Sequence, residues 1–420
     1  MKKVLLVAPV MSRSGYGEMG RFALRSMMSN PDIDLYLHNI NWGKTGWIWK
    51  DDNERRMIDS LLQKTMIYRQ NNGSFDASVQ CTIPNEWQRL SPHDVGYTAG
   101  IETDKVAPQW LQKGNDMQKI IVISEHSKNT YAQAHYPATN TETGEQIAEY
   151  RCTTPIDVVG FPRKEIEPTS VDMNLRHDFN FLCVAQLGPR KNVDAVIGNF
   201  IEEFQNEEVG LLLKLNGAND SVMDYHNVVT MFDGIKKTLK EEGHKCSINL
   251  IHGSLTDEQV HGLYTHPKVK AMVSFTHGEG FGLPLYEAAY SGLPVVATNW
   301  SGHLDFLTTD KKVPVNNVTS SKKGKISKIT KVPQFAAVKY ELVDIPPEAV
   351  WDGVLNAGTK WAKIDDTDAR KKMRDVYKNH SKWSKKAKKH AKTFDNATTL
   401  YAAFNEALAL SSPEEDIVVI

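Results

Sequence analysis

The sequence has little cysteine and no long apolar run. Its four cysteines, Cys81, Cys152, Cys183 and Cys246, lie far apart among 420 residues, and no two form a Cys-x-x-Cys pair. This spacing favours neither a zinc site nor a disulfide framework, so we expect a reducing, cytoplasmic compartment. No run of about 18 apolar residues occurs, so no transmembrane helix is expected.

An excess of charge of either sign is also missing. The chain has 50 Lys+Arg and 51 Asp+Glu, which gives a formal net charge of −1. Attraction to nucleic acid or to an anionic membrane would therefore need a local patch of positive charge. Hydrophobic residues make up 40% and charged residues 24%, which excludes a mainly disordered chain, a collagen and a coiled-coil rod.

The sequence does contain short strand-like runs that alternate with helix-like stretches. The strand-like runs are residues 4–8, 34–39, 95–98, 120–123, 157–159, 179–185, 210–215, 247–251, 271–274 and 294–297. Helix-like stretches such as 17–28, 193–204 and 283–291 lie between them. This alternation predicts βαβ units with parallel sheets. We therefore predict an α/β fold of two doubly wound, Rossmann-like domains that face each other across a cleft, the usual place for a ligand.

The domain boundary is predicted where prolines and mixed charge precede a new strand, in residues 161–174. We expect an N-terminal domain of residues 1–165, a C-terminal domain of residues 166–392, and a helix and tail, 393–420, that return to the N-terminal domain. The apolar start is interpreted as a buried first strand, because it is too short for a signal peptide and Arg13 follows closely.

The most informative stretch is SFTHGEGFGLPLYEAAYSGLPVVAT, residues 274–298. It predicts a strand, a glycine-rich loop at 278–282, and a helix with Pro284 in its first turn. Free N–H groups at such a helix start favour phosphate or sugar oxygens. Glu279 and Glu287 flank the turn. Their separation, at most ~12 Å in a helix, is comparable with the distance from a sugar to a ribose across a diphosphate.

This stretch resembles the glutamate–seven residues–glutamate signature of retaining GT-B glycosyltransferases of the large group 1 class. The resemblance implies a UDP- or GDP-linked sugar as donor, bound by the C-terminal domain, and no required cofactor. It implies that Glu279 contacts the donor sugar and that Glu287 holds the ribose hydroxyls. The backbone that would hold sugar and phosphate is that of Gly280, Phe281, Gly282 and Leu283.

A second segment, VAQLGPRKNVDAVI, resembles the strand and basic phosphate clamp of the same class. Lys191 matches the lysine of that clamp. The class often has a Gly-Arg pair where this chain has Ala185 and Gln186, so Arg190 is the substitute candidate. Cations are needed here because a departing diphosphate gains negative charge. The alternative is that Arg190 and Lys191 are solvated loop charges.

Two further glycine loops are candidates for donor contact. INLIHGSLTDEQVHGLYTHP resembles the class where backbone from Gly253 to Leu255 meets the base. SGYGEMGRF contains a literal Gly-x-Gly-x-x-Gly, and Gly17 in it would cap the cleft near the donor phosphate. The same glycines leave an NAD-dependent dehydrogenase as an alternative. Against it, the first glycine comes six residues after Pro9, and no acidic residue ends the second strand.

The acceptor side is predicted in the N-terminal domain, in VGYTAGIETDKVAPQW. Many members of the class carry a histidine near this strand end, where this chain has Thr98, Gly100 and Glu102. Glu102 is therefore a candidate for acceptor contact or proton acceptance. The alternative is a carboxylate that favours a helix N-terminus.

Asp-x-Asp triplets, which bind metals in glycosyltransferases of another fold, occur at residues 32–34 and 366–368. We interpret both as turn or cap residues and expect no required metal. The expected function is sugar transfer with retention to an acceptor hydroxyl of a glycan, lipid or other molecule. The alternatives are a phage-type DNA glycosyltransferase that acts on hydroxymethylated bases, the dehydrogenase, and an inactive sugar-nucleotide-binding protein.

A basic helix is predicted over residues 370–392, where eleven Lys or Arg accompany a single acid, Asp375. Spacings of three and four residues place many of these cations on one helical face. Three interpretations stay open. The helix is a solvated surface, or it binds an anionic membrane, or it binds a nucleic-acid backbone such as DNA.

Overall fold

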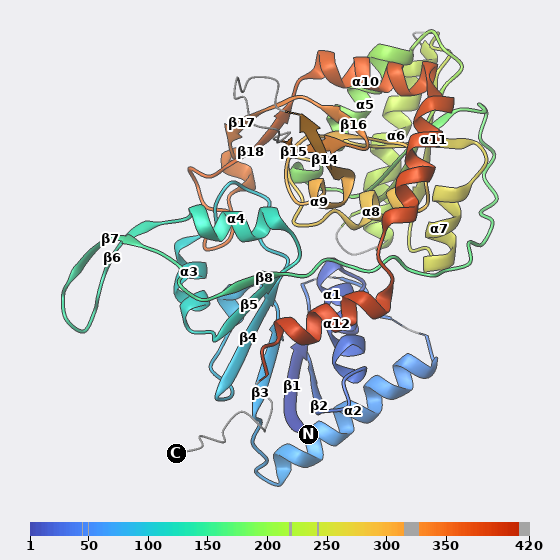
Figure 1. The fold of residues 1–420 in the computed structure, drawn as a ribbon. Coiled ribbons are helices and arrows are strands. Elements are labelled where there is room, and N and C mark those ends of the chain that lie inside the picture. The colour runs from blue at the N-terminus through green and yellow to red at the C-terminus, as the bar shows by residue number, and fades with distance from the viewer. Residues whose placement is uncertain (44, 49, 218–220, 242, 315–326, 411–420) are drawn as a thin grey trace.

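The chain forms two α/β units, one above the other in Figure 1. This computed structural model describes residues 1–43, 45–48, 50–217, 221–241, 243–314 and 327–410. The last part of the predicted C-terminal tail, 411–420, lies outside the described residues. Among the described residues, no helix combines the length and the apolar character needed to cross a bilayer.

The first unit is built on a parallel sheet with the strand order β2-β1-β3-β4-β5-β8. Its strands are β1 (Lys2–Ala8), β2 (Ile33–Asn39), β3 (Ala77–Cys81), β4 (His93–Thr98), β5 (Lys119–Val122) and β8 (Ile156–Val158). Its helices are α1 (Gly15–Met28), α2 (Asn53–Gln70), η1 (Pro84–Glu86), α3 (Pro108–Asn115) and α4 (Glu125–Gln133). An antiparallel hairpin of β6 (Tyr136–Thr139) and β7 (Gln146–Tyr150) projects away from this unit (Figure 1).

The second unit is also built on a parallel sheet, with the strand order β11-β10-β9-β12-β13-β16. Its sheet contains β9 (Asn180–Gln186), β10 (Gly210–Asn216), β11 (Ser247–His252), β12 (Val269–Ser274), β13 (Val295–Thr298) and β16 (Ala336–Val338). Its helices are η2 (Pro189–Lys191), α5 (Val193–Phe204), α6 (Val222–Glu241), α7 (Asp257–Thr265), α8 (Leu283–Tyr290), α9 (Leu304–Leu307), η3 (Pro347–Ala349), α10 (Asp366–Lys378), α11 (His380–His390) and η4 (Ala391–Thr393). Two antiparallel pairs join β14 (Thr308–Pro314) to β15 (Ser327–Pro333) and β17 (Tyr340–Asp344) to β18 (Lys360–Ile364).

The apolar runs of the sequence become the central strands of both sheets. Val4, Leu5 and Leu6 of β1 are at most 1% exposed, because helices cover both faces of a parallel sheet. Phe181 of β9 packs in the same way against Phe204 of α5, with ring centroids 5.5 Å apart. The predicted fold class, two doubly wound parallel sheets, is confirmed.

A last helix, α12 (Ala397–Ala407), lies against α1 of the first unit (Figure 1). Phe404 is fully buried there, with its ring centroid 5.4 Å from that of Phe22 and 5.1 Å from that of Tyr97. The Asn405 side chain donates a hydrogen bond to the Ser26 carbonyl at 2.7 Å. The chain after the second unit therefore contributes to the core of the first.

The prediction of one continuous basic helix over residues 370–392 is wrong. α10 ends at Lys378 and α11 begins at His380. The Asn379 side chain donates to Asp375 at 2.7 Å, which stabilises the break. Arg374 lies 2.5 Å from Glu203 and 2.7 Å from Glu207, so part of the predicted cationic face is paired with acids near α5.

Candidate functional site

The candidate site is built where the carboxyl end of β12 meets the first unit. In the loop after β12, a Cβ on Gly278 would lie 2.1 Å from the Glu102 carbonyl oxygen, and one on Gly280 would lie 2.5 Å from that of Ala99. Gly282 has a φ of +93°, which L side chains rarely adopt. The glycines of this loop are therefore needed for close contact with the first unit and for the turn into α8.

Glu279 lies in this loop with its side chain almost fully buried. Its carboxylate accepts hydrogen bonds from Lys191 Nζ at 2.6 and 2.9 Å and from Arg190 Nη1 at 3.1 Å. Burial raises the pKa of the Glu279 carboxyl, but Lys191 and Arg190 outweigh it and lower the pKa to about 2. Its backbone N–H donates to Ser301 Oγ at 2.9 Å. Glu279 is therefore a fixed, ionised carboxylate.

Arg190 connects this carboxylate to the first unit. Its Nη1 also donates to the Gly278 carbonyl at 2.7 Å, and its Nη2 lies 3.3 Å from Glu102 Oε1. The structure thus brings together Glu102, Arg190, Lys191 and Glu279, all four side chains that we selected as catalytic candidates. We call these four residues the cation–carboxylate cluster.

Glu287 lies outside this cluster, on α8. Its Oε2 accepts a hydrogen bond from the Tyr264 hydroxyl at 3.1 Å, and its Oε1 is 3.9 Å from Lys164 Nζ. Burial raises the pKa of the Glu287 carboxyl to about 7; Lys164 opposes this shift and Glu18 adds to it. The two glutamates of the motif therefore differ in charge state near neutral pH. Environments that separate two carboxyl groups in this way are typical of functional sites.

Gly17 and Phe281 are two further donor-site candidates, and contacts within the protein account for the position of each. A Cβ on Gly17 would lie 2.0 Å from the Ser12 carbonyl oxygen, so the start of α1 requires glycine there. The ring of Phe281 packs on Phe161 with centroids 5.0 Å apart, so only its backbone could face a ligand. Leu283 begins α8, directly after Gly282.

The loop after β11 holds the other two candidates. Gly253 has a φ of +95°, and Leu255 is partly buried against the core of the second unit. Thr256 then caps α7 by a reciprocal pair of hydrogen bonds with Gln259. This loop leads directly into α7, which carries Tyr264, the partner of Glu287.

Three residues near Glu279 or Glu287 were not selected from the sequence. His303 is fully buried, with Nε2 2.7 Å from the Thr298 carbonyl oxygen and Nδ1 3.5 Å from Ser301 Oγ, and burial lowers its pKa. Its one sequence signal is the segment Ser-Gly-His after β13. Ser124, before α4, donates to the Gly280 carbonyl at 2.6 Å. Lys164, between the units, belongs to no motif.

Neither Asp-x-Asp triplet shows an open set of metal ligands. Asp34 accepts hydrogen bonds from Lys64 and Tyr36. Asp366 accepts from Asn199 at 2.7 Å, and Asp368 accepts from the Lys339 backbone at 2.9 Å. Within the described ranges, no group of three His, Cys, Asp or Glu side chains is arranged to hold a metal ion.

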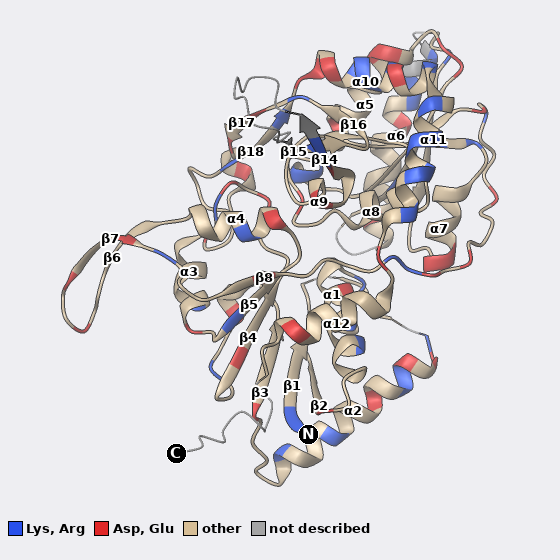
Figure 2. Ribbon diagram, viewed as in Figure 1, with Lys and Arg blue, Asp and Glu red and all other residues tan. Residues whose placement is uncertain are grey.

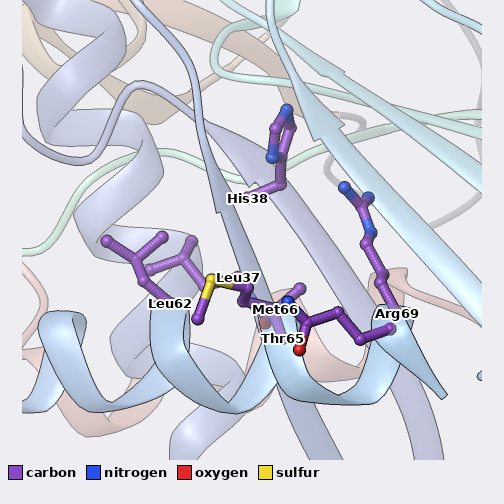
Figure 3. Close-up of a pocket in the computed structure, with 7 residues that line it drawn as sticks. Leu37, His38, Leu62, Thr65, Met66 and Arg69 are labelled. Atoms are coloured by element: carbon purple, nitrogen blue, oxygen red, sulfur yellow. Dashed lines mark hydrogen bonds between the residues drawn. The ribbon is translucent and has the colours of Figure 1, made fainter.

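Two surface hollows lie elsewhere. One, between β2 and α2, is lined by Leu37, His38, Leu62, Thr65, Met66, Arg69 and Gln70 (Figure 3). The other is lined by Lys378, Asn379, Ser381, Lys382 and Lys385 near the start of α11, a helix rich in Lys (Figure 2). Neither contains a residue of the cation–carboxylate cluster.

Comparison with known proteins agrees with the fold. Residues 174–331 match the family described as Glycosyl transferases group 1. No protein of curated function matches the sequence significantly. Anabaena Alr3699/HepE in complex with UDP and glucose is a similar solved structure, with a TM-score of 0.52, 12% identity, and coverage of 97% of this chain and 99% of that one.

Other solved structures match at low identity. The E. coli structure described as trehalose-6-phosphate bound with UDP-2-fluoro glucose has a TM-score of 0.56 and 8% identity, and the match covers 97% of this chain and 99% of that one. The pneumococcal O-GlcNAc transferase GtfA, in complex with UDP and GlcNAc, has a TM-score of 0.47 and 12% identity. That match covers 88% of this chain and 63% of GtfA, so this chain spans less than two thirds of the length of GtfA.

The two facing doubly wound units have the GT-B fold that these structures share. More particularly, residues 174–331 of the second unit match the group 1 glycosyl transferases. This match favours the transferase over the NAD-dependent dehydrogenase.

Proposed function

We propose that the protein is a retaining glycosyltransferase that moves a sugar from a UDP- or GDP-linked donor to an acceptor hydroxyl. The observation that carries this proposal is the ionised Glu279, held by Lys191 and Arg190 beside the glycine loop that begins α8. A carboxylate beside two cations in a partly buried site suits a ligand that has both hydroxyls and a diphosphate, because the carboxylate can accept from hydroxyls and the cations can bind phosphate oxygens.

In this proposal the donor lies along the start of α8. Glu279 accepts a hydrogen bond from a sugar hydroxyl, and Glu287 accepts from the ribose hydroxyls. Lys191 has three N–H donors and Arg190 has five, so each can bind a diphosphate oxygen and keep a contact with Glu279. Backbone N–H groups at the start of α8 add partial positive charge.

The chemistry that these groups support is transfer by positioning and charge stabilisation. The bond from the anomeric carbon to the phosphate oxygen breaks, and a bond from that carbon to the acceptor oxygen forms on the same face. The acceptor proton passes to an oxygen of the leaving phosphate. Glu279 is engaged by two cations and is therefore a poor nucleophile, which favours this route. Glu102, 3.3 Å from Arg190, is our candidate for acceptor contact or proton acceptance.

A nucleotide screen tests the proposal. UDP-sugars, GDP-sugars and NAD are compared for protection against thermal unfolding, and products are then identified by mass spectrometry. We expect a UDP- or GDP-sugar to raise the melting temperature and to be turned over. Protection by NAD alone would support the dehydrogenase instead, and protection by a nucleotide sugar without transfer or hydrolysis would support an inactive binding protein.

Substitution of Glu287 should weaken nucleotide binding in a pH-dependent way. Glu287→Gln loses the charged acceptor for the ribose hydroxyls, at a cost of roughly 1–3 kcal/mol in donor binding. The ionised form accepts these hydrogen bonds, and the pKa of Glu287 is raised to about 7, so wild-type affinity should rise as pH increases through 7. Titration calorimetry from pH 6 to 9 measures this. Glu258→Gln, on the neighbouring α7, is the matched control, and an unchanged pH profile in Glu287→Gln would contradict the assignment.

A DNA acceptor is a second candidate, supported by the lysines around the hollow at the start of α11. Phosphate contacts by lysine are strongly salt-dependent. If DNA is the acceptor, duplex DNA containing hydroxymethylated bases should be retained at low salt, and the triple change of Lys378, Lys382 and Lys385 to Gln should abolish retention. Absence of retention at low salt would rule DNA out and leave a glycan, a lipid or another hydroxyl.

A further inference from the structure

Lys164 lies in the segment that crosses from the first unit to the second. Its side chain is close to carboxylates on three helices. Its Nζ lies 3.3 Å from Glu18 Oε2 on α1, 3.3 Å from Asp257 Oδ2 on α7, and 3.9 Å from Glu287 Oε1 on α8. The first of these helices belongs to one unit and the other two belong to the second. One lysine therefore connects the expected ribose carboxylate to the other side of the molecule. We call Lys164 and its three carboxylates the linker cluster.

Each end of the linker cluster is anchored by further contacts. Arg21 Nη2 donates to Glu18 Oε1 at 2.6 Å, and Arg21 Nη1 donates to the carbonyls of Val10 and Ser12 at 2.7 and 2.9 Å. Arg21 is thereby bonded both to Glu18 and to the loop before α1. At the other end the Tyr264 hydroxyl donates to Glu287. A continuous polar path thus runs from the loop before α1 to Glu287.

The charges of the linker cluster are unevenly distributed. Glu18 is close to two cations; burial raises its pKa, but Lys164 and Arg21 lower it to about 2. Glu287 faces the same lysine at a longer distance, with Glu18 and Asp257 as further negative neighbours and with Tyr264 and Tyr290 beside it. Lys164 is the cation that opposes the protonation of Glu287. Without it, Glu287 would keep its burial and lose the compensating charge.

We infer that Lys164 is a positioning residue for the donor, which fixes the Glu287 carboxylate for the ribose hydroxyls and links it to Glu18 at the start of α1. This role rests on the function proposed above, because it assigns the ribose to Glu287. Nucleotide binding on the second unit is then coupled to the loop that precedes α1 on the first. The competing explanation is an ion pair that only stabilises the interface between the units.

Binding of UDP and GDP, measured by titration calorimetry from pH 6 to 9, separates the two explanations. Lys164→Met keeps the length of the side chain and removes its charge, so we expect about tenfold weaker nucleotide binding at pH 7. The pH midpoint of binding should move upward, KM for the donor should rise, and kcat at saturating donor should change little. Lys164→Arg should restore most of the affinity. Arg163→Met, the adjacent cation that pairs with Glu165 at 3.6 Å, should behave like wild type.

A ribose-modified nucleotide tests whether Lys164 acts through Glu287. The penalty of Lys164→Met should be smaller for 2′-deoxyuridine diphosphate than for UDP, because one hydroxyl partner of Glu287 is missing. An equal penalty for both nucleotides would overturn the inference. So would a Lys164→Met variant that melts at a lower temperature but binds UDP and GDP like wild type at every pH. If wild-type protein binds neither UDP nor GDP, the proposed function itself fails.

Discussion

The Lys191→Met variant should lose about 10²- to 10³-fold in kcat, because it removes a preorganised cation from the place where the leaving diphosphate gains charge. Lys191 Nζ lies 2.6 Å from Glu279 and its side chain is partly exposed, so it needs no movement of the chain to reach a diphosphate beside that carboxylate. Arg190 remains as a partner for Glu279, and the fold should therefore survive. Steady-state kinetics with the donor found in the screen give kcat, and thermal unfolding gives the stability.

The control for this prediction is Lys268→Met, because Lys268 pairs with Asp178 on the surface of the same unit at 3.3 Å. It should keep wild-type kcat. Lys191→Arg, which retains the charge, should recover part of the activity. If the activity lost in Lys191→Met only follows the fraction of unfolded protein, Lys191 is a structural residue and the phosphate assignment is wrong.

The Glu279→Gln variant should lose both turnover and stability, and the two losses can be separated. The amide keeps the shape of the side chain but leaves Lys191 without an anion and Arg190 with Glu102 alone, and removal of one partner from a buried ion pair costs about 3–5 kcal/mol. The pKa of Glu279 is lowered to about 2. Its stabilising effect is therefore present above pH 4.5 and is lost as the pH falls from there toward 2. Urea unfolding should show a large deficit at pH 7 that shrinks at pH 3.

Nucleotide binding gives the sharper test of Glu279. In Glu279→Gln, Lys191 is released from its carboxylate and Arg190 keeps Glu102 and the Gly278 carbonyl as partners. UDP should therefore bind at least as tightly as it does to wild type, while kcat for sugar transfer falls about 100-fold because the donor sugar loses its hydrogen-bond acceptor. Glu348→Gln, an exposed carboxylate of the same unit, is the matched control. Loss of UDP affinity together with unchanged kcat would show that Glu279 contacts the nucleotide and not the sugar.

The fold could be predicted because parallel strands that are buried on both faces leave continuous apolar runs in the sequence. The stretch 193–204 was predicted as a helix and forms α5 over the same residues. β3 was missed because its buried face is partly polar. Ser78 and Gln80 are buried there and find partners in Asp94 and the Gln88 carbonyl, and such pairing is invisible to an apolar pattern.

The break between α10 and α11 shows a second reason why a structural feature could not be predicted from the sequence. The spacing of charges over residues 370–392 fits one helix, and nothing local terminates it strongly. The break is accompanied by contacts of Asp375 with Asn379 and Trp383, and by the pairing of Arg374 with acids near α5. The pairing of Arg374 is a tertiary contact, and tertiary contacts of this kind override helical periodicity.

The candidate site was predictable where residues lie next to glycine loops at strand ends. Glu279, Arg190 and Lys191 follow such strands, and Glu102 follows β4, so the topology of two facing sheets brings all four together. Their catalytic roles stay predictions. Lys164 could not be found in this way, because its partners come from three helices that are distant in the sequence and its own segment has no motif.

The most direct test of the central claim is a crystal structure of the protein soaked with the nucleotide sugar that gives the largest thermal shift. We predict diphosphate oxygens within hydrogen-bond distance of Lys191 and Arg190, ribose hydroxyls on Glu287, and a sugar hydroxyl on Glu279. A nucleotide bound elsewhere, with Glu279 contacting only Lys191 and Arg190 as it does here, would contradict it.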